Sequence, residues 1–179
     1  MKKLKNEELN RLSTEEFKTA QKVPLAIVLD DVRSAYNVGS VFRTADAFRI
    51  SMIHLCGISA RPPHKDIHKT ALGADESVDW KYFPDVRDSV AVLKDQGFNI
   101  YAFEQTDSSI LLQDFKPDPG KKLAFIFGHE VFGVKEELLG IIDGSVEIPQ
   151  FGTKHSLNIS VSAGIAIWDV FSKLYPEGI

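Results

Sequence analysis

The chain has 179 residues, the size of one domain, so a single hydrophobic core is expected. Hydrophobic residues make up 44% of it, a fraction that excludes an intrinsically disordered protein. Its 21 lysine and arginine residues stand against 25 aspartate and glutamate residues, which gives a formal net charge of −4. This balance does not fit a protein that coats nucleic acid through a broad basic face. Any such contact must therefore be local or shared between subunits.

Cys56 is the only cysteine, which excludes a disulfide within the chain and makes a reducing cytoplasm the expected compartment. Residues 2–5 are basic like the start of a signal peptide, but polar residues 6–8 follow where an apolar stretch would be needed. No apolar run approaches the roughly 18 residues that a membrane-spanning helix needs. We therefore expect a cytoplasmic protein without a membrane segment.

The predicted elements begin with an N-terminal arm, residues 1–23, in which Ser13 and Glu16 form a capping pattern for a short helix. One α/β domain is expected over residues 24–179. Apolar runs typical of strands buried on both faces recur at residues 25–29, 52–55, 98–103, 123–127 and 146–148. Helical patterns separate them at residues 37–49, 85–96, 134–142 and 156–173. The alternation predicts a mostly parallel sheet covered by helices on both faces.

In such sheets, ligands bind beyond the carboxyl ends of the strands, which directs attention to the loops after Leu29, Phe127 and Ile148. After the first strand, Asn37 is a suitable N-cap for a helix, and Gly39 beside it would leave backbone amides free for an anion. Arg43 lies opposite the apolar stripe of that helix and is expected in the cleft. Together these residues suit a phosphate and its ribose. A capped surface helix with an exposed arginine is the alternative, and it stays open here.

The other two loops carry glycine and small residues. Gly128 and Gly133 bracket Glu130 directly after a strand, and glycine lets a ligand approach the backbone closely. Ser156 is a suitable N-cap for a helix whose first turns are crowded with small residues such as Gly164. Glycine within a helix costs about 0.5–1 kcal/mol relative to alanine, so a second backbone is expected to pass close to this helix.

Taken together, the three segments resemble the motifs of the SpoU branch of the SPOUT RNA methyltransferases. The pattern Asn-x-Gly-x-x-x-Arg-Thr-Ala starts at Asn37, Gly-x-Glu-x-x-Gly at Gly128, and Ile-Pro-x-x-Gly-x-x-x-Ser-Leu-Asn at Ile148. The resemblance runs from about Pro24 to Lys173. Each motif alone is modest, but the three in this order and spacing are highly specific.

The resemblance implies a C-terminal deep trefoil knot over roughly residues 123–170, although knots are essentially absent from ordinary folds. It also implies that S-adenosylmethionine sits in the knot, held mainly by backbone. The matching positions for cofactor binding are Gly128, Ile148 and Leu157, with Glu104 and Thr106 near one end of the cofactor.

The family's polar active-site residues fall on Asn37, Arg43, Glu130, Ser156 and Asn158. The implied reaction is methylation of a ribose 2′-hydroxyl in tRNA or rRNA by a homodimer in which the arginine meets the partner's cofactor. His129 and Gln150 depart from the family's usual Asn and Met without removing a residue assigned to catalysis.

The basic segment at residues 61–69 is the predicted contact with the RNA backbone, through Arg61, Lys65 and Lys69. A solvated loop is the alternative, because charged loops are the norm. His64 and His68 could share a helix face at metal-binding spacing, but no third ligand is evident and no metal site is expected.

Two other classes of function were weighed. A non-catalytic RNA-binding or assembly factor could keep the same fold, although retention of Arg43, Glu130 and Asn158 argues against it. A Rossmann-like enzyme should carry a glycine-rich loop directly after the first strand, and residues 29–33 lack one.

Overall fold

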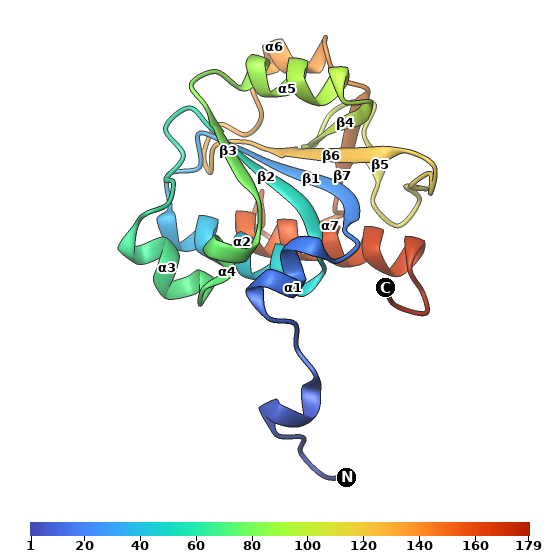
Figure 1. The fold of residues 1–179 in the computed structure, drawn as a ribbon. Coiled ribbons are helices and arrows are strands. Elements are labelled where there is room, and N and C mark those ends of the chain that lie inside the picture. The colour runs from blue at the N-terminus through green and yellow to red at the C-terminus, as the bar shows by residue number, and fades with distance from the viewer.

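A computed structural model describes residues 1–179, apart from the side chain of Asn6. Its centre is a sheet of seven strands in the order β3-β2-β1-β6-β4-β7-β5 (Figure 1). All neighbouring strands pair in parallel. The strands are β1 (Val23–Asp30), β2 (Ile50–Cys56), β3 (Trp80–Phe83), β4 (Phe98–Phe103), β5 (Ile110–Leu111), β6 (Lys122–Phe127) and β7 (Gly144–Glu147).

Helices cover both faces of the sheet, as predicted (Figure 1). One face carries α1 (Thr14–Thr19), α2 (Ala35–Ala47), α3 (Lys65–Ala71), α4 (Ala74–Ser77) and α7 (Ile159–Leu174). The other face carries α5 (Val86–Asp95) and α6 (Glu136–Leu139). In the part of the chain that the structure describes, no helix combines the length and apolar character that a membrane crossing requires.

Strand β1 shows why the apolar runs form a two-sided core. Leu25, Ile27 and Leu29 belong to the cluster under α2 and α7, whereas Ala26 and Val28 belong to the cluster under α5. Successive side chains of a strand point to opposite faces, so an unbroken apolar run buries both. The strand is therefore fixed at the centre of the sheet, and its last residue, Asp30, is delivered to the carboxyl edge.

The N-terminal segment leaves the body of the protein and ends away from it (Figure 1). It contains η1 (Asn6–Leu9) and then α1, where the Ser13 hydroxyl accepts from the Glu16 amide and the Glu16 carboxylate accepts from the Ser13 amide. This is the predicted capping pattern. Phe17 is buried in the core beneath the sheet and attaches α1 to the domain.

Two predicted helix starts are wrong. Helix α2 is capped by Ser34, whose hydroxyl accepts from the Asn37 amide at 3.3 Å, so Asn37 already lies inside the first turn. Helix α7 is capped by Asn158, whose side chain accepts from the Ser160 amide at 2.9 Å, and Ser156 lies in the loop before it. In each case the chain offered two good capping residues a few positions apart.

Short elements account for the remaining differences. Strands β3 and β5 and helices α3 and α4 were not predicted, and the helix expected over residues 134–142 forms only at Glu136–Leu139. Elements of two to seven residues carry too little hydrophobic periodicity to be recognised.

Candidate functional site

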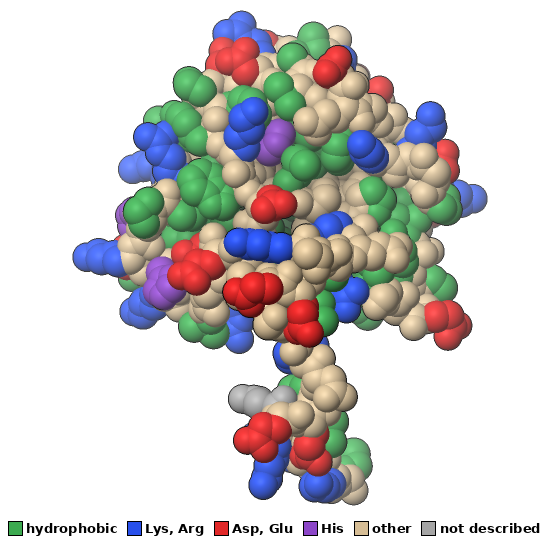
Figure 2. All heavy atoms as spheres, in the orientation of Figure 1, with side chains coloured by type: hydrophobic (Ala, Val, Ile, Leu, Met, Phe, Trp, Pro, Cys, Tyr) green, Lys and Arg blue, Asp and Glu red, His purple; other side chains and the backbone are tan. Residues whose placement is uncertain are grey.

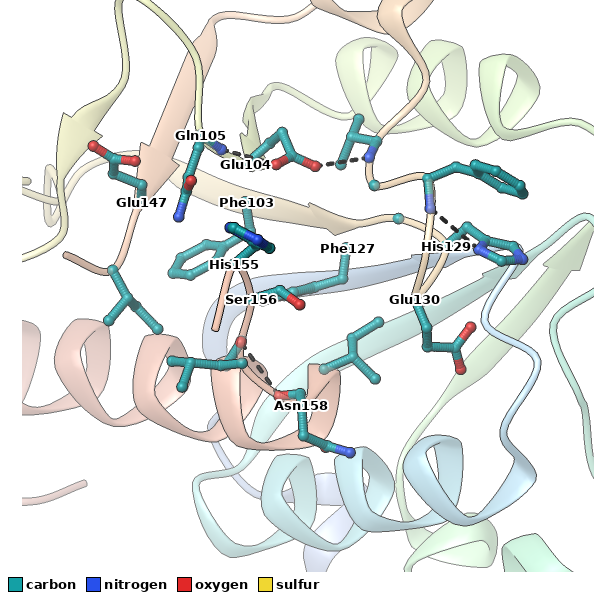
Figure 3. A pocket seen from close by; sticks show the side chains of 18 of the residues that line it. Phe103, Glu104, Gln105, Phe127, His129, Glu130, Glu147, His155, Ser156 and Asn158 are labelled. Carbon is teal, nitrogen blue, oxygen red and sulfur yellow. Dashed lines mark hydrogen bonds between the residues drawn. The ribbon is translucent and has the colours of Figure 1, made fainter. Parts of the chain in front are cut away.

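A cavity of about 560 Å³ opens at the carboxyl edge of the sheet, beyond β4, β6 and β7 (Figure 3). This is where a parallel α/β sheet is expected to bind a ligand, and the volume is typical of a small-molecule site. Three segments and the start of α7 build its walls. The lining residues are Phe103–Gln105, Phe127–Val134, Glu147, Ile148, Gln150, His155–Ile159 and Ser162.

The cavity combines an apolar wall with acidic groups (Figure 3). The rings of Phe103 and Phe127 stack with centroids 4.9 Å apart, at the ends of the neighbouring strands β4 and β6. The carboxylates of Glu104, Glu130 and Glu147 also line the cavity, and its described lining contains no lysine or arginine. A site with these charges favours a ligand that carries positive charge and has an apolar or aromatic part.

The loop after β6 is a tight turn that glycine makes possible. The backbones of His129 and Gly133 exchange hydrogen bonds of 3.0 and 2.8 Å, and Gly133 has φ +69°. The His129 Nδ1 accepts from the Val131 amide at 2.9 Å. A Cβ on Gly128 would overlap the carbonyl group of Gly133 and the amide of Val134. The glycines expected to admit a ligand therefore also let the loop fold back on itself.

Glu130 joins this loop to the start of α2. Its carboxylate accepts from the Ser34 amide at 3.1 Å and from the Arg33 amide at 3.2 Å. Burial raises the pKa of Glu130, but these amide hydrogen bonds outweigh burial and hold the pKa below its ordinary value. The group is therefore a carboxylate at neutral pH, engaged by backbone.

Helices α2 and α7 meet beside the cavity. The Asn158 Nδ2 donates to the Asn37 Oδ1 at 3.2 Å, and the Asn158 side chain also caps α7. The first turn of α2 is thereby linked to the cavity rim, which Asn37 itself does not line.

The structure brings together most, but not all, of the predicted site residues. Glu104, Gly128, Glu130, Ile148, Ser156, Leu157 and Asn158 line the cavity. Thr106 does not, and its hydroxyl lies 2.6 Å from that of Ser145. Arg43 is exposed on α2 and does not line the cavity of a single chain. Its expected place in the cleft is therefore not reached within one subunit.

Gly39 has a different environment from the one expected. It lies in the second turn of α2, and a Cβ there would overlap the Thr70 hydroxyl and the Ile67 carbonyl of α3. The free amides of the first turn precede it. Gly39 therefore lets α3 pack closely against α2, which places the basic residues of α3 beside the first turn of α2.

The basic segment is partly helical. His64 caps α3, its Nδ1 accepting from the Asp66 amide at 3.2 Å, and Lys65 and Lys69 are exposed on the helix. The guanidinium of Arg61 lies 3.9 Å from the ring centroid of Tyr82. Among the described residues, no cluster of three histidine, cysteine or acidic side chains could hold a metal ion.

Several lining residues were missed by sequence reasoning. Phe103 and Phe127 were assigned only to strands, although both are the last residue of their strand and so lie at the binding edge. Glu147 and His155 also line the cavity. The rule that places ligands at strand ends could have selected Glu147, which ends β7. No signal in the sequence pointed to His155.

The fold and the cavity together define an α/β ligand-binding domain with its site at the carboxyl edge of a parallel sheet. The sequence model of the SpoU rRNA Methylase family matches residues 24–168. The chain belongs to this family. It is 30% identical over 173 residues to a tRNA (guanosine(18)-2′-O)-methyltransferase of Thermus thermophilus, covering 96% of this chain and 87% of that protein.

Solved structures show the same fold. The A. aeolicus TrmH/SpoU tRNA modifying enzyme superposes with a TM-score of 0.78 at 23% identity, over 92% of this chain and 81% of that one. An AdoMet-bound rRNA methyltransferase from Sinorhizobium meliloti superposes with a TM-score of 0.76 at 25% identity, over 83% of this chain and 56% of that one. The parallel α/β fold class is thereby confirmed, while the knot over residues 123–170 stays a prediction.

Proposed function

We propose that the protein transfers the methyl group of S-adenosylmethionine to a ribose 2′-hydroxyl of tRNA or rRNA. Family membership and the similarity to 2′-O-methyltransferases over nearly the whole chain support this activity. They favour it over a non-catalytic RNA-binding factor of the same fold. The observation that carries the proposal is the acidic, partly aromatic cavity at the motif loops.

The cavity fits this cofactor. Its carboxylates suit the positive sulfonium and amino groups, and the rings of Phe103 and Phe127 offer an apolar surface to the adenosine. Gly128, Ile148 and Leu157 would hold the cofactor largely through backbone, with Glu104 at one end. Thr106 would act through its contact with Ser145. When bound, the cofactor supplies a methyl group on a positive sulfur, ready for attack by an oxygen nucleophile.

The chain's residues must align the ribose oxygen and help to release its proton. Arg43, as a cation, would hold the RNA phosphate and polarise the 2′-hydroxyl, with the proton passing to solvent or phosphate. Glu130 and Asn37 would orient the start of α2, and Ser156 and Asn158 would shape the loop around the target ribose.

We propose that the active unit is a homodimer, because Arg43 lies outside the cavity of its own chain. Helix α7, which packs against α2, exposes Val161, Ile165 and Trp168 at helical spacing, with exposed fractions of 49%, 38% and 56%. An unpartnered apolar stripe of this kind is typical of a subunit interface. A second copy seated on α7 would bring a partner's cavity towards Arg43.

The expected result is that the purified protein binds S-adenosylmethionine in calorimetry and transfers labelled methyl groups to total RNA. Nuclease mapping of the labelled RNA would then identify the nucleotide and separate tRNA from rRNA. Cofactor binding without transfer to any RNA would favour the non-catalytic alternative. Absence of cofactor binding would overturn the proposal.

RNA would enter along α3. Figure 2 shows basic and acidic side chains interspersed on the face in view, without a broad basic field, so contact with phosphates must be local. Lys65, Lys69 and Arg61 would supply that contact beside the first turn of α2. The arm formed by residues 1–23 is a further candidate to contact RNA, and the cytoplasm, where tRNA and rRNA are found in bacteria, is the proposed compartment.

Replacing both Lys65 and Lys69 by alanine should weaken RNA binding and flatten its dependence on salt. Each lost phosphate contact lowers the slope of log K against log salt by about 0.9. Binding titrations over a series of salt concentrations measure this slope. Lys94 on α5 and Lys121 before β6, both exposed, provide the matched pair of control substitutions. An equal change in the control pair, or no change in slope, would place the RNA elsewhere.

A further inference from the structure

Loops that follow three different strands meet at one lysine. Lys135 comes directly after the cavity loop, and its Nζ lies 3.1 Å from the Asp30 Oδ1 and 2.8 Å from the Asp31 Oδ2. Asp30 ends β1, and the Asp31 Oδ1 accepts from the amide of Ile58 in the loop after β2. None of the motifs described above includes Lys135 or assigns it a role.

This contact is a charged one in a place with little solvent. The side chain of Asp30 is 1% exposed, and that of Lys135 is 40% exposed. Burial raises the pKa of Asp30 in spite of the neighbouring ammonium. Burial lowers the pKa of Lys135, but hydrogen bonds to Asp31 and Asp30 outweigh it and raise the pKa above its ordinary value. Removing the ammonium alone would leave a buried carboxylate without a counter-charge.

Lys135 is the second of two anchors on the cavity loop. Glu130 attaches the front of the loop to the amides of Arg33 and Ser34, and Lys135 attaches its rear to Asp30 and Asp31. Both anchors end on the same short segment, residues 30–34, which leads into α2. The turn between the anchors is exposed, with Val131 at 75% and Phe132 at 82%. With one anchor lost, this turn is free to pivot about the other.

We propose that Lys135 is a positioning residue for methyl transfer, which holds the cavity loop against the segment that starts α2. It thereby fixes the cofactor cavity relative to Asn37 and the ribose-binding residues of α2. The proposal rests on the proposed methyl transfer. Because residues 128–134 line the cavity, the same contact also sets the shape of the cofactor site before RNA binds.

The test is Lys135→Met, which keeps the length of the side chain and removes its charge. We expect the Kd for S-adenosylmethionine in calorimetry to rise about 10-fold and kcat at saturating cofactor and RNA to fall about 10-fold, as for other residues that orient a site. Amides of residues 131–134 should exchange hydrogen faster in the free protein, because the rear anchor is lost.

Lys173→Met is the matched control. The Lys173 Nζ donates to the carbonyls of Leu112 and Phe115 at 2.8 and 2.9 Å and pairs with Asp169, away from the cavity. It should lower thermal stability without changing the cofactor Kd. An equal rise in Kd in this control would reduce the effect of Lys135 to general destabilisation and overturn the proposal.

The double variant Asp30→Asn, Lys135→Met keeps the test informative if Lys135→Met fails to fold. With both charges removed, stability should recover while the rise in cofactor Kd persists, since the anchor is still missing. Wild-type affinity and kcat in the double variant would mean that Lys135 only neutralises Asp30, which sinks the proposal. A wild-type protein that binds no S-adenosylmethionine would instead refute the proposed function itself.

Discussion

Replacing Arg43 by alanine is expected to reduce methyl transfer by about 100- to 1000-fold, the usual effect of removing one group that stabilises developing charge. The Kd for S-adenosylmethionine should stay within about twofold of wild type, because Arg43 is exposed and lines no part of its own chain's cavity. Single-turnover methylation with labelled cofactor, together with calorimetry, measures both quantities.

The control for this substitution is Arg87→Ala. Arg87 is exposed on α5, on the opposite face of the sheet, where it pairs with Asp85. It should leave methyl transfer unchanged. Turnover of Arg43→Ala at the wild-type rate would remove Arg43 from the mechanism. Loss of cofactor binding with turnover would move it from catalysis to cofactor recognition.

The parts of the fold that the sequence could predict are the long apolar elements. The run at residues 25–29 is buried on both faces, so its pattern was strong, and the sheet built from such runs set the binding edge. Strand β5 has two residues and α4 has four, and elements this short carry no usable period. Their positions depend on the neighbours that they pair with or pack against.

The candidate site was predictable where a motif directly follows a strand, as Gly128 and Glu130 do. It was not predictable where long-range contacts decide the role. Glu130 accepts hydrogen bonds from amides almost a hundred residues earlier in the chain, at Arg33 and Ser34, and Lys135 reaches Asp30. Gly39 was expected to serve an anion, but its contacts with Ile67 and Thr70 depend on how α3 packs. Such pairings exist only once the sheet has formed.

Gly128→Ala should deform the cavity and abolish cofactor binding. The added Cβ would overlap backbone atoms of Gly133 and Val134, and these cannot move alone because Gly133 is bonded to His129 and the Val134 amide to Glu104. Overpacking of this kind costs about 1–3 kcal/mol of folding free energy, and rearrangement of the loop should raise the Kd for S-adenosylmethionine by at least about 100-fold. Thermal unfolding and calorimetry provide the measurements.

Gly140→Ala is the control for this loop, since Gly140 has an ordinary φ of −81° and a Cβ there would meet nothing within 4 Å. It should leave cofactor affinity unchanged. Normal cofactor affinity in Gly128→Ala would show that the turn at residues 128–133 does not shape the cofactor site.

Mixing the two inactive variants tests whether the site is shared between subunits. Arg43→Ala keeps an intact cavity, and Gly128→Ala keeps an intact arginine, so a mixed dimer has one complete site only if Arg43 acts on the partner's cavity. Random pairing of equal amounts should then restore about a quarter of wild-type activity, provided light scattering shows that both variants still dimerise. If Arg43 acts within its own chain, no pairing assembles a complete site, and the mixture should be as inactive as either variant alone.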